Sequence, residues 1–130
     1  MKAYWDTSAL IKALADAGLR DRLEQEGGIT RTHSLAEMFS ALTGGNLSIR
    51  LTADDAAAIL EDISQHLEFV SLDSTGVLKA FTAAQRRGVR GARVHDYLHA
   101  VAAVDHSHKL LTCDRNDFND LVGGLEVEQV

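Results

Sequence analysis

Hydrophobic residues recur along the chain in two patterns: short, nearly unbroken runs, and longer stretches with an apolar residue every three or four positions. The first pattern is typical of buried strands and the second of amphipathic helices. Strands are expected at 2–5, 29–32, 68–72, 109–113 and 125–128. Helices are expected at 7–17, 19–26, 34–42, 52–67, 74–87, 93–106 and, in a short piece, 115–121.

Strands that alternate with helices predict an α/β fold with a central parallel sheet and helices on both faces. A length of 130 residues fits one domain, and the chain contains no linker or low-complexity segment. We therefore expect a single domain over 1–130. In sheets of this kind, ligands bind beyond the carboxyl ends of the strands, so candidate chemistry is sought at that edge.

Five acidic residues are expected at this edge. Asp6 ends the first strand, and Asp114 and Asp117 follow the fourth. Glu37 lies in the first turn of the helix after the second strand, and Asp96 lies in the first turn of the helix that leads into the fourth. Because that helix must run antiparallel to the strand it precedes, its N-terminus lies where the fourth strand ends.

Each of these residues also has a purely structural interpretation. Asp6 and Asp114 can cap the helices that follow them, and Asp96 and Asp117 can favour a helix dipole from the first turn. The sequence Ser34-x-x-Glu37 is a capping-box pattern, in which serine and glutamate each satisfy a free backbone amide.

Taken together, the five carboxylates favour a metal site. Several carboxylates at one edge repel each other, and burial makes their ionisation more costly. A divalent cation removes that repulsion, and hard oxygen ligands without a thiolate favour Mg²⁺ or Mn²⁺. Such a site suits hydrolysis of a phosphodiester bond by an activated water.

Charge and composition limit the possible binding partners and the cellular compartment. A net charge of −6 argues against a simple electrostatic nucleic-acid binder, although it is compatible with a nuclease whose acidic site holds a metal. The single cysteine, Cys113, excludes an internal disulfide and suits a reducing cytoplasm. Apolar stretches are too short for a membrane span, so we expect a cytoplasmic protein without membrane contact.

Four stretches together resemble the PIN-domain ribonucleases, most closely the VapC-like toxins of bacterial and archaeal toxin–antitoxin pairs. They are YWDTSAL (4–10), SLAEMFSAL (34–42), HDYLHAVAA (95–103) and LLTCDRNDF (110–118), in the family's order over nearly the whole chain. The resemblance implies a single PIN-like domain with a five-stranded parallel sheet in the order 3-2-1-4-5. It also implies metal-dependent cleavage of RNA with Mg²⁺ or Mn²⁺ and a cognate antitoxin as partner.

The family's acidic set matches Asp6, Glu37, Asp96, Asp114 and, as a frequent fifth member, Asp117. The resemblance implies that Asp6 and Asp96 bind the metal directly, with Asp114 completing the metal set, and that Asp117 completes the site or helps to hold a second ion. Glu37 would act through a water on the metal or orient the nucleophile.

Two small hydroxyl residues, Ser8 and Thr112, match positions suited to hydrogen bonding around the acidic set. His99 stands where the family often has an aliphatic residue, which is a departure from its pattern.

Three further features have open interpretations. The stretch RRGVRGAR (86–93) is either a solvated loop or a crossing that brings Arg90 and Arg93 to the acidic edge as contacts for RNA phosphates. His95 and His99 have the spacing of two helix-borne zinc ligands, but no third nitrogen or sulfur ligand accompanies them. Apolar residues of the helices at 7–26 and 52–67 either pack in the core or exceed what one sheet covers, in which case a homodimer or an antitoxin would bury them.

Two other functional classes remain as alternatives. A phosphoacceptor receiver domain is also a parallel α/β fold, and Asp73 follows the third strand as its acceptor would, although Asp6 stands alone where that fold needs an acidic pair. The second alternative is a non-catalytic binding module whose acidic residues are only helix caps.

Overall fold

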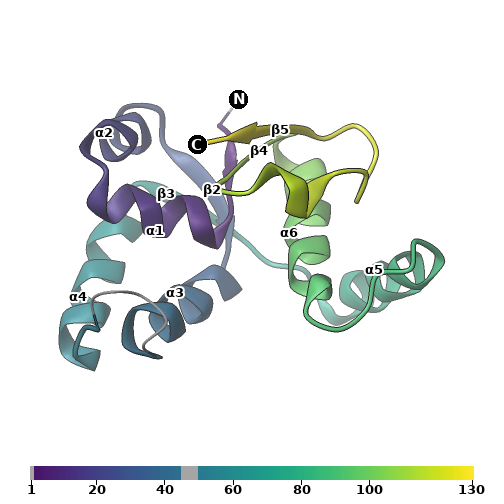
Figure 1. Ribbon diagram of the computed structural model, residues 1–130, viewed down its shortest axis with the longest axis horizontal. Coiled ribbons are helices and arrows are strands. Elements are labelled where there is room, and N and C mark those ends of the chain that lie inside the picture. Colours follow the sequence, from purple (N-terminus) through teal and green to yellow (C-terminus); the bar gives the residue numbers. More distant parts are fainter. Residues whose placement is uncertain (1, 45–49) are drawn as a thin grey trace.

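A five-stranded parallel sheet lies at the centre of the molecule (Figure 1). The computed structural model describes residues 2–44 and 50–130. The strands are β1 (Tyr4–Trp5), β2 (Gly28–Arg31), β3 (Leu67–Val70), β4 (Lys109–Thr112) and β5 (Glu126–Gln129). Their order is β3-β2-β1-β4-β5, as predicted, so the order reverses between β1 and β4. Ligand sites are expected beyond the ends of these two strands.

Helices cover both faces of the sheet (Figure 1). Trp5 and Leu111 face one apolar cluster and Tyr4 and Leu110 face the other, because successive side chains of a strand point to opposite faces. The first cluster is covered by α1 (Thr7–Ala15), α2 (Ala17–Glu26), α3 (His33–Gly44) and α4 (Ala53–Ser64). The second is covered by α5 (Ser74–Arg86), α6 (Arg93–His106) and the short 3-10 helix η1 (Arg115–Phe118).

Most predicted elements are present, with ends that shift by a few residues. One local difference is at Asp16, which ends α1 and caps α2 through a hydrogen bond from the Leu19 amide to its carboxylate, 3.0 Å long. The second helix therefore begins at Ala17 and not at residue 19. The short helix predicted at 115–121 is limited to one 3-10 turn.

The predicted capping box at Ser34 and Glu37 is wrong. Helix α3 begins at His33, which places Ser34 inside the helix and fully buried. The Ser34 hydroxyl lies 2.7 Å from the Thr30 hydroxyl. The Glu37 carboxylate accepts a hydrogen bond from the buried His99 ring, on α6. Because the helix starts earlier than predicted, Ser34 and Glu37 do not bond each other's backbone amides. Ser34 contacts Thr30, and Glu37 is directed toward α6.

The apolar residues of the first, second and fourth helices are used in the core. Leu10, Leu23 and Leu60 belong to one buried cluster, so of the two interpretations that the sequence left open, packing in the core is the one that these residues support. Among the described residues, the exposed large hydrophobic side chains lie on α3 and α5: Phe39, Leu78 and Phe81. No described helix is both long and apolar enough to cross a lipid bilayer.

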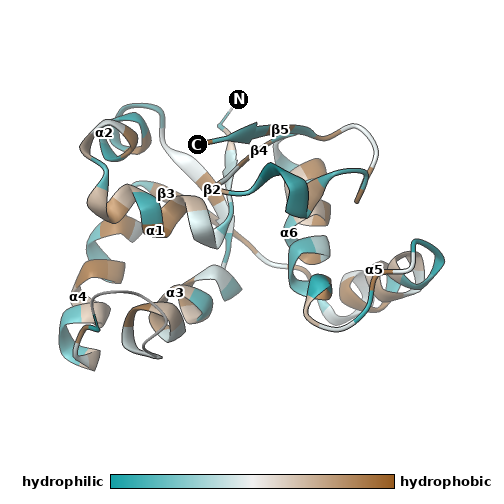
Figure 2. Ribbon diagram, in the orientation of Figure 1, coloured by the Kyte–Doolittle hydropathy of each residue, from teal (hydrophilic) through white to brown (hydrophobic). Residues whose placement is uncertain are grey.

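Charged side chains attach the edge strand β5 to the rest of the fold. Figure 2 shows β5 as a hydrophilic strand. Its Glu128 carboxylate accepts hydrogen bonds from Arg22 on α2 and lies 2.9 Å from the Lys109 ammonium on β4. These two cations lower the pKa of Glu128 to about 2.

Candidate active site

Acidic residues from four different elements line one small cleft at the carboxyl end of β1. The cleft has a volume of about 250 Å³. Its lining residues are Asp6, Thr7, Ser8, Ile11, Glu37, Asp96, His99 and Asp117. The parallel sheet and the direction of α6 bring these residues together from distant parts of the sequence, as the topology predicted. Four of the five predicted acidic residues therefore share one site.

Asp6 both caps a helix and faces the cleft. It precedes α1, and its Oδ1 atom accepts hydrogen bonds from the Ala9 amide (2.9 Å) and the Ser8 hydroxyl (2.7 Å). The side chain is buried, and burial raises the pKa of Asp6 although Thr112, the Ala9 amide and Ser8 oppose the rise. The structural and functional interpretations of this residue are therefore both supported by the same geometry.

The hydroxyls of Ser8 and Thr112 connect α1 to the end of β4. Ser8 Oγ lies 3.3 Å from Thr112 Oγ1 and accepts a hydrogen bond from the Cys113 amide at 3.0 Å. Thr112 Oγ1 also accepts the Asp114 amide at 3.2 Å. Because Ser8 donates to Asp6, this chain of hydrogen bonds fixes the Asp6 carboxylate at the switch point of the sheet, where the strand order reverses between β1 and β4.

Asp96 is a carboxylate without a structural partner. It lies in the first turn of α6, whose cap residue Ala92 makes no side-chain hydrogen bond. The described residues donate no hydrogen bond to it. Burial raises the pKa of Asp96, and the negative charges of Asp117 and Asp6 raise it further, while the basic side chains of His99 and Arg93 oppose the rise. Asp96 thus contributes to the cleft a carboxylate that accepts no hydrogen bond from the described residues.

Glu37 is held by a buried histidine. His99 Nε2 lies 2.9 Å from Glu37 Oε1, and His99 Nδ1 lies 2.6 Å from the Tyr4 hydroxyl. Burial favours a higher pKa for Glu37, but the hydrogen bond from His99 and the basic side chains of His33 and Arg31 bring the pKa below its ordinary value. Sequence reasoning missed this role of His99; a histidine within the apolar face of α6 was the available signal.

His95 and His99 do not form half of a zinc site. The exposed His95 ring stacks on the ring of His33, with centroids 6.0 Å apart. His99 is turned toward Tyr4 and Glu37 instead. The helical spacing that suggested a shared metal therefore places the two rings in different surroundings.

Asp114 and Asp117 have different roles in the local structure. The Asp114 carboxylate caps η1 by accepting the Asn116 amide at 3.0 Å, and the residue is exposed. It is not among the residues that line the cleft, whereas Asp117 is. The predicted metal-binding role of Asp114 stays a prediction, and its structural interpretation as a cap is confirmed.

Comparisons with known proteins agree with this fold. The model of the PIN domain family matches residues 3–123. The chain belongs to the PIN domain family. Its fold is similar to a chain in the crystal structure of VapBC2 from Rickettsia felis bound to a DNA fragment from their promoter. That match has a TM-score of 0.75 at 16% sequence identity and covers 100% of this chain and 99% of the other. No curated protein matches the sequence.

The arginine-rich stretch of this PIN domain places Arg93 and Arg90 differently. Arg93 begins α6, one turn before Asp96, and lowers the pKa of that acid. Arg90 lines a separate hollow of about 680 Å³ between α5 and α6, together with Phe81 and Val94. The crossing that the sequence suggested thus brings Arg93 to the acidic edge, while Arg90 faces the neighbouring hollow.

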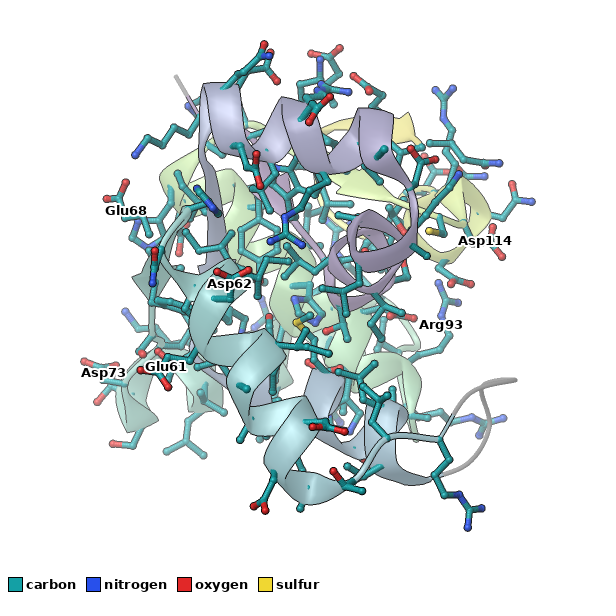
Figure 3. All side chains as sticks on the ribbon, turned by 90° about the vertical axis from the view of Figure 1, so that its left-hand side faces the viewer. Glu61, Asp62, Glu68, Asp73, Arg93 and Asp114 are labelled. Carbon is teal, nitrogen blue, oxygen red and sulfur yellow. The ribbon has the colours of Figure 1, made fainter. Side chains whose placement is uncertain are left out.

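Asp73 does not take part in the cleft. Its carboxylate caps α5 by accepting the Gly76 amide at 2.7 Å. Figure 3 shows Asp73 on one side of the molecule and Arg93 and Asp114 on the other. Asp73, the candidate acceptor of the receiver-domain interpretation, therefore lies away from Asp6.

The cleft fits a hard divalent cation by its chemistry. No group of three acidic, histidine or cysteine side chains within 2–44 and 50–130 is arranged closely enough to enclose a metal ion. However, Mg²⁺ keeps several waters and usually takes only one or two protein carboxylates together with substrate phosphate. Asp6 and Asp96 are carboxylates whose pKa values are raised in the metal-free chain, so a nearby cation would favour their ionised forms.

Proposed function

We propose that this PIN domain is a metal-dependent endoribonuclease, the toxin of a toxin–antitoxin pair. The observation that carries the proposal is the convergence of Asp6, Glu37, Asp96 and Asp117 on one cleft at the switch point of the sheet. Helix capping explains Asp6 alone among these four. The membership in the PIN domain family and the resemblance of four sequence stretches to VapC-like toxins support the same function.

Each residue of the site has a proposed role. Asp6 and Asp96 would bind the ion, and Ser8 keeps Asp6 oriented through its hydrogen bond. Bound Mg²⁺ or Mn²⁺ would polarise the scissile phosphate and make an attacking water more acidic. Glu37 Oε1 is occupied by His99, which leaves Oε2 to accept a hydrogen bond from that water. Asp117 and Asp114 would complete the acidic site.

The proposed partners are RNA, an antitoxin and a second copy of the chain. An antitoxin segment that blocks an acidic cleft should be basic, most simply through an arginine that donates to the carboxylates. A homodimer would bury the exposed apolar residues of α3 and α5, Phe39, Leu78 and Phe81. Co-purification from the native host and a measurement of molar mass in solution test these two proposals separately.

Metal-dependent cleavage by matched variants tests the activity. The purified chain should cleave RNA with Mg²⁺ or Mn²⁺ and stop when EDTA is in excess. Glu37→Gln should lose cleavage by orders of magnitude, whereas the same substitution at the exposed Glu61 on α4 should have no effect. Full activity in excess EDTA, with contaminating nuclease excluded, would contradict the metal requirement. If the wild-type chain bound RNA without cleaving it under any metal, the non-catalytic binding module would be the better description.

A further inference from the structure

A chain of hydrogen bonds runs from the sheet through α6 to the cleft. The His99 ring is 2% exposed and lies between the Tyr4 hydroxyl, from β1, and Glu37, from α3. Its Nδ1 atom is 2.6 Å from Tyr4 Oη and its Nε2 atom is 2.9 Å from Glu37 Oε1. Both ring nitrogens of a buried histidine are thus used, one toward the core and one toward the site.

The atom that donates the proton in each of these hydrogen bonds can be assigned by starting at Tyr4. Its oxygen accepts a hydrogen bond from the Arg31 amide at 3.3 Å. A tyrosine hydroxyl keeps its proton near neutral pH, since its ordinary pKa is about 10. In the arrangement that this geometry favours, that proton is donated across the short contact to His99 Nδ1, the unprotonated nitrogen of the ring, while Nε2 faces Glu37 Oε1 and, at 3.5 Å, the Thr7 hydroxyl. The remaining ring proton is on Nε2 and is donated to the Glu37 carboxylate.

We propose that His99 is a positioning residue for Glu37 and that Tyr4 sets the imidazole tautomer this requires. The opposite tautomer would present a lone pair of Nε2 to the carboxylate and turn Glu37 away from the cleft. Without either donor, the flexible glutamate side chain would lose its fixed direction, and ordering it again has an entropic cost. The effect on catalysis rests on the proposed function, whereas the tautomer does not.

The tautomer can be measured directly on the intact chain. A long-range ¹H–¹⁵N correlation spectrum of the histidine rings, with the His99 signals assigned by their loss in His99→Gln, should show a ring protonated on Nε2 and unprotonated on Nδ1. Tyr4→Phe should shift these signals toward a mixture of tautomers. A wild-type ring protonated on Nδ1, or on both nitrogens, would overturn the proposal.

Cleavage kinetics test the positioning. His99→Leu removes the hydrogen-bond donor and places an apolar side chain of similar size at the buried position. We expect kcat to fall about 10–100-fold, as for other residues that orient a site residue without contacting the substrate. KM should change less than kcat, because His99 is buried and acts through Glu37. His99→Gln should recover most of the loss, because its amide can accept from Tyr4 and donate to Glu37. Tyr4→Phe should lower kcat, and Tyr97→Phe, which changes another buried tyrosine, should not.

The outcomes separate this inference from the proposed function. A wild-type chain that shows the Nε2–H tautomer but never cleaves RNA would contradict the nuclease and leave the tautomer assignment intact. An active wild type with an equally active, folded His99→Leu would overturn the positioning role and leave the nuclease intact. If His99→Leu fails to fold by circular dichroism, Tyr4→Phe alone decides, and wild-type kcat in that variant would overturn the proposal.

Discussion

Removing the charge of Asp6 should stabilise the metal-free protein. Asparagine is as good an N-cap as aspartate, so Asp6→Asn keeps the hydrogen bond from the Ala9 amide while it removes a buried negative charge. Burial raises the pKa of Asp6, and each unit of such a shift corresponds to about 1.4 kcal/mol between the two protonation states. In EDTA at pH 7, we expect Asp6→Asn to raise the free energy of unfolding by on the order of 1 kcal/mol.

The pH dependence has a defined sign. A carboxyl group whose pKa is raised in the folded state binds its proton more tightly there than in the unfolded chain. The contribution of Asp6 to stability should therefore fall as the pH rises from the ordinary value of 3.8 through the raised pKa, and then stay constant. The advantage of Asp6→Asn should grow over the same interval and vanish below it.

Urea unfolding with a matched control tests this prediction. Asp16 caps α2 by accepting the Leu19 amide, as Asp6 caps α1, but it is exposed. Asp16→Asn should therefore change the stability by less than about 0.5 kcal/mol. Mg²⁺ at 100 times its Kd should stabilise the wild type by about 2.7 kcal/mol and Asp6→Asn far less. The reasoning fails if Asp6→Asn is less stable than the wild type at pH 7 in EDTA while Asp16→Asn is unchanged.

Three further predictions concern other parts of the fold. Ser34→Ala should cost about 1 kcal/mol in urea unfolding, because it removes the buried hydrogen bond to Thr30, and should leave cleavage intact; a cleavage defect would show that Ser34 affects the site. Glu128→Gln should cost about 1 kcal/mol at pH 7. That loss should shrink as the pH falls from 4.5 through about 2, because the lowered pKa of Glu128 confines the stabilisation to higher pH; a loss independent of pH would refute the ion-pair explanation. Arg93→Ala should reduce the salt-dependence slope of RNA binding by about 1, and adding Arg90→Ala should reduce it further only if Arg90 also binds phosphate; an unchanged slope in the double variant would make both residues ordinary surface arginines.

The fold could be predicted from the sequence because few arrangements satisfy the pattern. Alternating strands and helices require right-handed crossovers in a parallel sheet. Once α6 is known to feed β4, its first turn must lie at the edge where Asp6 ends β1. The convergence of Asp6, Glu37 and Asp96 therefore follows from the direction of each element. This convergence can be predicted without any knowledge of side-chain geometry.

The details of the site could not be predicted, because they depend on tertiary contacts and on single-residue boundaries. A helix start at His33 in place of Ser34 is within the usual uncertainty of a sequence pattern, yet it converts a surface cap into a buried hydrogen bond. The partner of Glu37 lies 62 residues away on another helix. The 3-10 geometry of η1, which directs Asp117 and not Asp114 into the cleft, has no signature in the sequence LLTCDRNDF.

Structural and chemical roles of an acidic residue compete only when they need the same lone pairs. A carboxylate has two oxygens and about four acceptor sites, and an N-cap uses one of them. Asp6 accepts the Ala9 amide and the Ser8 hydroxyl on Oδ1 and still lines the cleft. A capping box would instead turn Glu37 back along its own helix, away from α6, so Glu37 cannot hold both positions at once. Its hydrogen bond to His99 holds Glu37 toward α6, so the capping box is not formed. The Glu37 carboxylate therefore joins those of Asp6, Asp96 and Asp117 in the cleft.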